Sequence, residues 1–160
     1  MPTLPEETAI VRASLGDAAT LGTIASAAKA HWGYPASWLA QWAEALTITP
    51  ETIAAQEVFK AIRGGTTLGF YSLQPTDSAA WELDHLWVLP SFLRQGIGSA
   101  LFAHAVQQTH SRGARRLMIE SDPHAEGFYL QMGAYRIGTI TREIDGQSRA
   151  LPLLARDLPA

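Results

Sequence analysis

The sequence predicts one α/β (α+β) domain over residues 1–160, with a mixed central sheet of about seven strands and helices on both faces. Strand-like and helix-like segments alternate along much of the chain, which is typical of such folds. A strand, a helix and a second strand follow one another between residues 80 and 120. A unit of this length closes through a right-handed crossover into a parallel pair of strands. We see no internal repeat, linker or low-complexity segment.

The first part of the chain predicts a strand and two helices. Residues 9–13 form a short apolar segment that predicts the strand. Asp17 is placed to cap a helix that ends near His31, because apolar residues between them recur at the i, i+3, i+4, i+7 spacing of one helix face. The same spacing predicts a second helix from about Ser37 to Leu46.

The middle of the chain predicts a third, short helix and an antiparallel meander. Thr49-Pro50-Glu51 has a capping residue, a proline suited to the first helical position and an acid favoured by the helix dipole. Strands are expected over 57–63 and 66–73, joined by the two-residue hairpin signal Gly64-Gly65. A further strand is expected over 80–89.

The last third predicts two helices and three strands. A long helix is expected over 97–110, followed by a strand over 116–120. Asp122-Pro123 begins another helix, and Gly133 ends it. Two strands around Asp145-Gly146 complete the chain.

The segment between the strand at 80–89 and the long helix predicts an anion site. Pro90 ends the strand, and Arg94-Gln95-Gly96-Ile97-Gly98-Ser99 leads into the helix. Glycine lets a ligand approach the backbone, and the free N–H groups and dipole of a helix start favour phosphate. A Rossmann fingerprint is excluded because Leu101 occupies the third glycine position, and a P-loop is excluded because no lysine follows Gly98.

Two motifs together resemble the GNAT superfamily of acyl-CoA N-acyltransferases. Leu86-Trp87-Val88-Leu89-Pro90 and Gly96-Ile97-Gly98-Ser99-Ala100-Leu101 match its coenzyme A loop, and Ala125–Ala134 is similar to its Ala-x-x-Phe-Tyr helix. The predicted order of elements is also that of the superfamily. One departure is Leu93, where the family prefers Gln or Arg, and the adjacent Arg94 is the candidate to replace that contact.

The resemblance implies acetyl-CoA as co-substrate and direct transfer of the acetyl group to a primary amine of a small molecule or peptide. No metal is expected, because the chain has no cysteine and its five histidines show no HExxH or similar ligand spacing. Tyr129 is implied as the acid for the leaving thiolate, and the Val88 N–H as a donor to the oxyanion. The implied coenzyme contacts are Leu86, Trp87, Val88, Arg94, Gln95, Gly96, Ile97, Gly98, Ser99, Phe128 and Tyr129. Whether Asp122 or His124 also touches the coenzyme stays open.

The residue that deprotonates the amine is not decided by the sequence. Glu82, Asp84 and His85 are candidates on the strand before the loop, and a chain of water molecules is another. Alternation along the strand places Glu82 and Asp84 on one face. The other face is then formed by Trp81, Leu83, His85 and Trp87. By analogy with the family, the acceptor pocket is expected at the first two helices, with His31, Trp32 and Tyr34 as substrate contacts alongside His85.

Composition narrows the class of protein. The net charge is −3, which argues against nucleic-acid binding, and no apolar run is long enough to span a membrane. The absence of cysteine excludes a thiol nucleophile and fits a reducing cytoplasm. The acidic, proline-containing N-terminal stretch is not expected to be a signal peptide. A homodimer is compatible with the sequence. The alternatives to an enzyme are a non-catalytic acyl-CoA sensor and, more remotely, a nucleotide-binding regulator.

Overall fold

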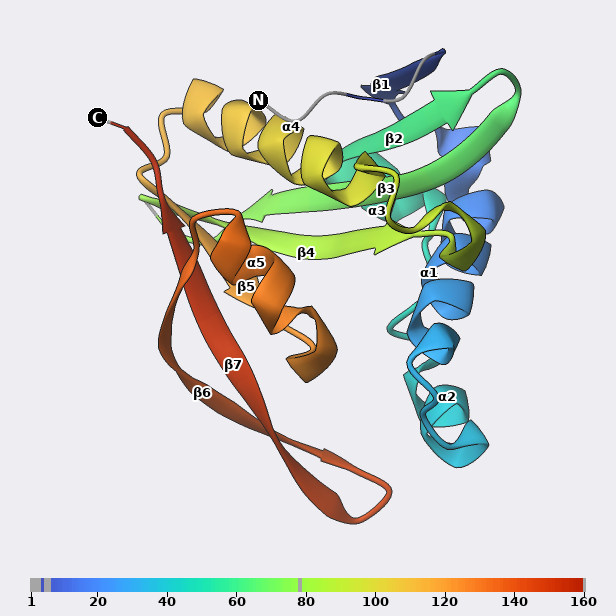
Figure 1. Cartoon of the computed structure of the whole chain (residues 1–160), viewed down its shortest axis with the longest axis vertical. Helices are drawn as coiled ribbons and strands as arrows, with labels where there is room; N and C mark the ends of the chain where they lie inside the picture. The colour runs from blue at the N-terminus through green and yellow to red at the C-terminus, as the bar shows by residue number, and fades with distance from the viewer. Residues whose placement is uncertain (1–3, 5–6, 78, 160) are drawn as a thin grey trace.

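A computed structural model describes residue 4, residues 7–77 and residues 79–159; most of the acidic N-terminal stretch lies outside these residues. Seven strands form one sheet in the order β1-β2-β3-β4-β5-β7-β6 (Figure 1). The strands are β1 (Thr8–Arg12), β2 (Glu57–Arg63), β3 (Thr66–Pro75), β4 (Ala80–Val88), β5 (Arg116–Glu120), β6 (Tyr135–Ile144) and β7 (Gln147–Asp157). The predicted fold class is confirmed.

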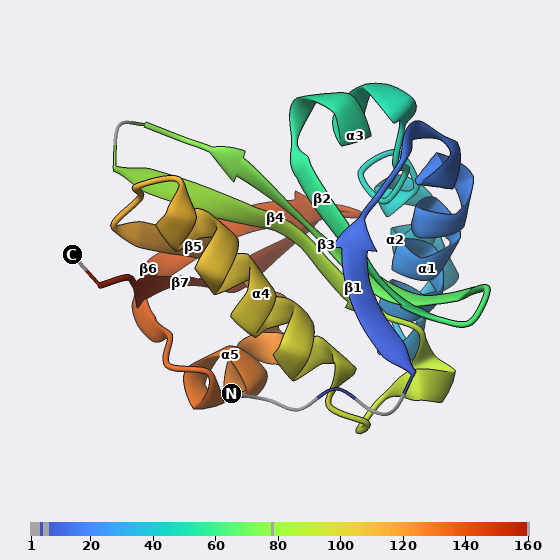
Figure 2. The ribbon, with the colours of Figure 1, turned by 90° about the horizontal axis from the view of Figure 1, so that it is seen from above.

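Helices cover both faces of the sheet, as predicted (Figure 2). The α-helices are α1 (Ala18–His31), α2 (Ala36–Trp42), α3 (Pro50–Ala55), α4 (Ile97–Ser111) and α5 (Glu126–Gln131). Three 3-10 turns are η1 (Leu15–Asp17), η2 (Pro90–Phe92) and η3 (Pro123–Ala125). α4 and α5 pack on one face of the sheet, and α1 and α3 pack on the other. No helix in the described part of the chain is long and apolar enough to cross a membrane.

The parallel pairing of β4 with β5 is short, and it leaves a gap between the two strands. The pairing runs only from Ala80 opposite Arg116 to Glu82 opposite Met118. Beyond Glu82 the two strands separate, β4 continuing toward α1 and β5 turning away beside β7 (Figure 1). The carboxyl-terminal half of β4 therefore has a neighbour on one edge only, and its other edge faces the gap.

β4 also contains a β-bulge. Ser72 of β3 pairs with His85, and the next residue, Leu73, pairs with Leu83, so that Asp84 has no partner. An extra residue reverses the alternation of the side chains that follow it.

The bulge overturns the predicted faces of this strand. Leu83 packs in the core beneath α4, whereas Trp87 packs in the core beneath α1, and the His85 ring lies 6.0 Å from Phe70 in that second core. The prediction that Leu83, His85 and Trp87 share a face is wrong, because periodicity alone cannot reveal an unpaired residue.

Two details of the first helices also differ from the prediction. α2 ends at Trp42 rather than near Leu46, because the chain continues only as turns, with the Leu46 N–H donating to the Trp42 carbonyl at 3.0 Å. Asp17 stands at the N-cap of α1, but its carboxylate accepts from Ser14 and Lys60 instead of from the helix. Leu46 is still buried in the core beneath α1.

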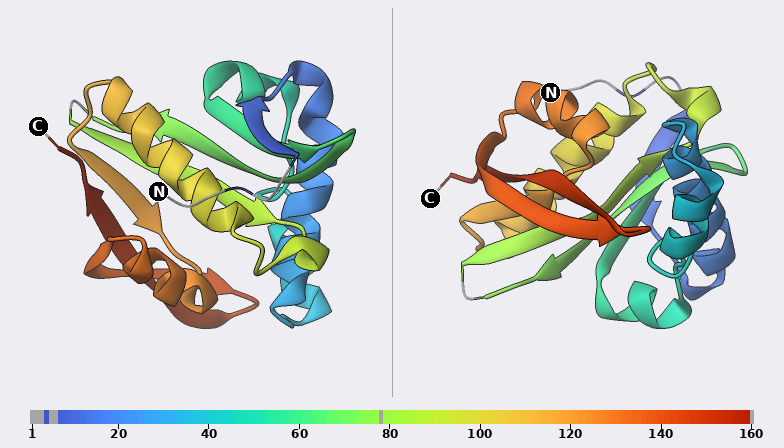
Figure 3. Two further views of the ribbon diagram at one scale, coloured as in Figure 1. Left: turned by 45° about the horizontal axis from the view of Figure 1, so that its top comes forward. Right: turned by 90° about the horizontal axis from the view of Figure 1, so that it is seen from below.

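The β6–β7 hairpin reaches across to α2 at its tip (Figure 3). Asp145 in the turn accepts hydrogen bonds from Ser37 and Gln41 at 3.2 and 3.1 Å, and its own N–H donates to the Gln41 side chain. These contacts join the tip of the β6–β7 hairpin to α2 across the gap between β4 and β5.

Candidate active site

The gap between β4 and β5 forms a cavity of about 820 Å³. Its walls come from the separated halves of β4 and β5, from α1 and the turns after α2, from α5, and from β6 and β7. The size suits a small molecule or part of a larger ligand. Segments that are far apart in the sequence therefore meet at one place.

The start of α4 lies at this cavity. Gly96 adopts the left-handed conformation, with φ of +80°, which glycine reaches without a steric penalty. The first backbone hydrogen bond of the helix runs from the Ala100 N–H to the Gly96 carbonyl at 3.0 Å. The N–H groups of Ile97, Gly98 and Ser99 precede it and have no intrahelical partner, so they are available to an anion.

The side chains of this loop contribute less than its backbone. Gly98 lines the cavity, but Ile97 is buried in the core and Gln95 accepts from Arg63 at 3.3 Å. Arg94 has a φ of +63° and an exposed side chain. Leu93, the departure from the family pattern, lines the cavity.

The free edge of β4 supplies further backbone donors. The Leu89 N–H donates to Leu68 of β3 at 2.8 Å. Since N–H groups point alternately to the two edges of a strand, the Val88 N–H points away from β3, toward the gap. This is the direction that a donor to an oxyanion in the cavity needs.

Phe128 and Tyr129 of α5 both line the cavity. Tyr129 is buried, and burial, with the charge of Asp122 as a second cause, raises the pKa of its phenol. Its hydroxyl makes no hydrogen bond to any residue that the structure describes. The phenol is thus held neutral, and its hydroxyl can donate a hydrogen bond to a ligand.

The three predicted bases lie in different surroundings. Glu82 accepts from Gln74 at 3.2 Å and does not line the cavity, whereas Asp84 and His85 do. Burial lowers the pKa of His85, opposed by the charge of Asp84. The Trp87 indole N–H, which can only donate, contacts the His85 Nδ1 at 2.9 Å, so the neutral ring uses its lone pair there and carries its proton on Nε2. His85 is therefore a donor to the cavity and not a free base.

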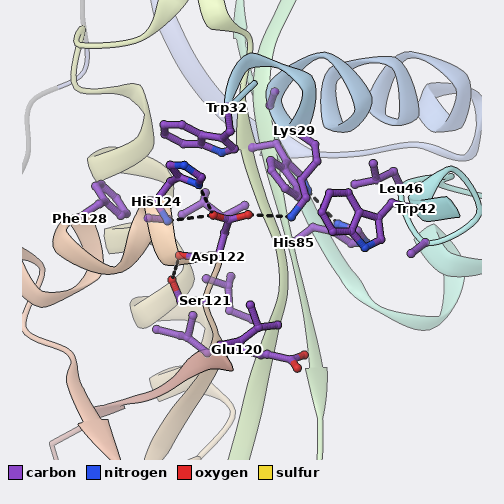
Figure 4. Close-up of a pocket in the computed structure, with 18 of the residues that line it drawn as sticks. Lys29, Trp32, Trp42, Leu46, His85, Glu120, Ser121, Asp122, His124 and Phe128 are labelled. Carbon is purple, nitrogen blue, oxygen red and sulfur yellow. Dashed lines mark hydrogen bonds and ion pairs between the residues drawn. The ribbon is translucent and has the colours of Figure 1, made fainter. Parts of the chain in front are cut away.

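Asp122 is the centre of a cluster at the end of β5 (Figure 4). Its carboxylate accepts from Lys29 at 2.7 Å, from the Tyr34 hydroxyl at 2.8 Å, and from both the backbone N–H and the Nδ1 of His124 at 2.9 and 2.8 Å. Burial alone would raise the pKa of Asp122, but the hydrogen bonds from Lys29 and His124 outweigh it and lower this pKa to about 2. Through its bond to the His124 N–H, Asp122 is the N-cap of the 3-10 turn η3, whereas the N-cap of α5 is Ala125.

Aromatic rings surround this cluster. The Trp32 indole stacks on the His124 ring at 4.9 Å with an angle of 9° between the planes (Figure 4). Lys29 lies over the Trp42 ring at 4.2 Å, and Tyr34 meets Trp42 edge to face. Trp42 packs on the core beneath α1 and lines the cavity as well.

The structure brings most of the predicted site residues to the cavity wall. The predicted residues that line it are His31, Trp32, Asp84, His85, Leu86, Trp87, Val88, Gly98, Phe128 and Tyr129. Those that do not are Tyr34, Glu82, Arg94, Gln95, Gly96, Ile97 and Ser99. Tyr34 lies behind the wall, where its hydroxyl contacts Asp122, and Ile97 and Ser99 can reach a ligand through their backbone N–H groups.

Comparison with known proteins agrees with this geometry. A family model described as "Acetyltransferase (GNAT) family" matches residues 24–134. The chain belongs to the GNAT acetyltransferase family. No curated protein sequence matches it significantly.

Solved structures of GNAT proteins share the fold. A GCN5-related N-acetyltransferase from Rhodopseudomonas palustris is 22% identical with a TM-score of 0.78, over 99% of this chain and 98% of that one. PaiA N-acetyltransferase from Thermoplasma acidophilum, solved with coenzyme A, is 18% identical with a TM-score of 0.73, over 94% and 98%. The ribosomal-protein-S18-alanine N-acetyltransferase of Escherichia coli is 20% identical with a TM-score of 0.70, over 96% and 95%.

The GNAT match ends at Ala134, before the last two strands, and the sequence analysis selected no residue there. Yet Arg142 and Glu143 of β6 and Arg149 of β7 line the cavity. Lys29 was missed as well, because its position on α1 carries no signal until the fold sets it against Asp122. Asp122 and His124 could be recognised as candidate site residues from the sequence, because they lie just before the helix that contains Phe128 and Tyr129.

Proposed function

We propose that this GNAT protein transfers the acetyl group of acetyl-CoA directly to a primary amine of a small molecule or peptide. The observation that carries the proposal is the cavity itself. One and the same space adjoins the free N–H groups that begin α4, the free edge of β4 and the unbonded hydroxyl of Tyr129. The coenzyme complex of PaiA, a protein of the same fold, supports the choice of co-substrate.

In the proposed mechanism the coenzyme's diphosphate binds at the N–H groups of Ile97, Gly98 and Ser99. Its pantetheine arm pairs with the free edge of β4 at Leu86–Val88. The amine nitrogen attacks the thioester carbon, and the Val88 N–H donates to the oxyanion that forms. When the C–S bond breaks, the leaving sulfur takes the proton of the Tyr129 hydroxyl, and the phenolate regains a proton from solvent.

The attacking amine must lose its own proton, because a free alkylamine with a pKa near ~10 is mostly protonated at neutral pH. Two groups at the cavity can accept it, the Asp84 carboxylate and the Nε2 of His124. Since Asp122 is ionised, the contact at His124 Nδ1 places the ring proton there, which leaves the lone pair of Nε2 free. The absence of cysteine from the chain favours direct transfer, because no thiol can form an acyl-enzyme. It also fits our proposal that the protein works in a reducing cytoplasm.

The test is a panel of amines and short peptides incubated with the protein and acetyl-CoA. We expect thiol release that depends on the amine and equals the amount of acetylated product by mass spectrometry. A non-catalytic acyl-CoA sensor would bind the coenzyme in calorimetry and release no thiol with any amine. That result would reject the proposed transfer.

Tyr129→Phe should lower kcat by about a hundredfold, the usual contribution of a positioned acid, with coenzyme affinity unchanged within about twofold. Because the hydroxyl has no partner in the described structure, its removal leaves no group unsatisfied and the fold intact. Steady-state thiol release and calorimetry measure the two quantities. Tyr135→Phe is the control, since that hydroxyl bonds Asp157 on the surface. A variant that keeps the wild-type kcat would remove Tyr129 from the mechanism.

A further inference from the structure

Arg149 of β7 is an unpaired cation at the cavity. It lines the cavity, yet it forms no ion pair with any carboxylate in the described residues. Its one side-chain hydrogen bond runs to the Tyr34 hydroxyl at 2.8 Å. Arg142, which lines the same cavity, is instead paired with Glu120 at 2.7 Å.

Three aromatic rings hold the Arg149 guanidinium in place. Its central carbon lies 5.0 Å from the Tyr34 ring, 5.1 Å from Trp42 and 5.6 Å from Trp38. Such contacts stabilise a cation without neutralising it. The group is planar and always charged, and it has five N–H donors, of which the hydrogen bond to Tyr34 uses one. A fixed guanidinium with free donors is suited to bind a carboxylate through two parallel hydrogen bonds.

The charges around Arg149 leave it uncompensated. Lys29 and Asp122 neutralise each other at 2.7 Å. Burial lowers the pKa of Lys29, and the neighbouring charge of Arg149 acts in the same direction. This corner of the cavity therefore holds two cations and one carboxylate, an excess of one positive charge.

The cavity wall also carries carboxylates that lack a cationic partner. Glu143 lines the cavity and has no ion pair among the described residues, and the only such contact of Asp84 is with His85 at 3.8 Å. Because burial keeps His85 neutral, Asp84 also lacks a cationic partner. Trp32, Trp42 and Trp87 supply apolar surface in the same cavity.

We propose that the acceptor is an amine that also carries a carboxylate, an amino acid or similar zwitterion with an apolar or aromatic side chain, and that Arg149 binds the carboxylate. This inference rests on the proposed acetyl transfer and names its substrate class. The unpaired carboxylates at the cavity attract the ammonium group, and the indole rings contact the apolar side chain.

The experiment compares Arg149→Gln and Arg149→Lys with the wild-type protein and with Arg116→Gln as control, because Arg116 is paired with Asp157 at 3.1 Å and does not line the cavity. The substrates are phenylalanine and leucine, their amides, and phenethylamine. Arg149→Gln should lower kcat/KM for the two acids about ten- to a hundredfold, the usual worth of a charged hydrogen bond, and change it less than about twofold for the amides and phenethylamine. Arg149→Lys should recover part of the loss, and Arg116→Gln should resemble the wild type. Each substrate is compared across variants, since the amides have less basic amino groups.

Calorimetry with the same compounds on protein saturated with coenzyme A measures recognition without turnover. Binding of the acids that is lost in Arg149→Gln supports the inference even when no thiol is released, in which case the acetyl transfer alone fails. Equal losses for acids and amides, or a wild-type protein that prefers the amides, would overturn the role of Arg149. Should Arg149→Gln not fold, the preference of the wild type and of Arg149→Lys for acid over amide decides the question.

Discussion

Gly98→Trp should weaken coenzyme A binding by a hundredfold or more. A Cβ atom at this position would lie 3.7 Å from both Phe128 and Val88, an ordinary contact, so the backbone tolerates a small side chain. An indole has no room between those residues and must enter the cavity beside the N–H groups of α4. Losing two hydrogen bonds to a charged group, each worth about 1.5–3 kcal/mol, accounts for the expected factor.

Isothermal titration calorimetry with coenzyme A measures this loss. Gly98→Ala is the graded control, and its affinity should stay within about tenfold of the wild type because the added methyl group fits. Gly16→Trp places the same indole on an exposed turn with nothing within 4 Å, and it should bind normally. An unchanged affinity in Gly98→Trp would mean that the coenzyme binds somewhere else.

Asp122→Asn should lower the free energy of unfolding by about 3 kcal/mol or more at neutral pH. Only 9% of the Asp122 side chain and 12% of the Lys29 side chain are exposed, so the substitution leaves a buried ammonium group without its anion. Urea denaturation measures the difference. Asp157→Asn is the control, because Asp157 and its partner Arg116 are 60% and 44% exposed, and its loss should cost less than about 1 kcal/mol. Similar losses in the two variants would contradict the central place of Asp122.

The same carboxylate predicts how stability depends on pH. Its folded-state pKa of about 2 lies below the ordinary value of 3.8, so its contribution is complete above pH 4 and disappears as the pH falls toward 2. A shift of this size corresponds to about 2 kcal/mol. The wild type should lose that much more stability than Asp122→Asn between pH 5 and 2. Parallel acid curves for the two proteins would show that Asp122 titrates normally.

The features that could be predicted from the sequence are those encoded by neighbouring residues. The turn at Gly96 and Gly98 predicts the start of α4, and the Phe128-Tyr129 motif predicts α5. Both patterns can be recognised because each lies within a few consecutive residues. The succession of strands and helices along the chain, and the parallel pairing of β4 with β5, followed from the same local signals and a general rule for parallel connections.

The features that escaped prediction depend on contacts between distant segments. The bulge at Asp84 exists only in the pairing of β4 with β3, so alternation assigned His85 and Trp87 to the wrong face. Arg149 meets Tyr34 across 115 positions of sequence, and nothing near either residue indicates the other. The acceptor end of the cavity is built from such contacts, which is why the coenzyme loop was easier to recognise than the amine site.

A crystal structure with coenzyme A bound is the most direct test of the whole account. We predict the diphosphate oxygens within about 3.2 Å of the backbone nitrogens of Ile97, Gly98 and Ser99, with the thiol in the gap between β4 and β5 beside the Tyr129 hydroxyl. A diphosphate bound away from the start of α4, or a thiol outside that gap, would contradict it.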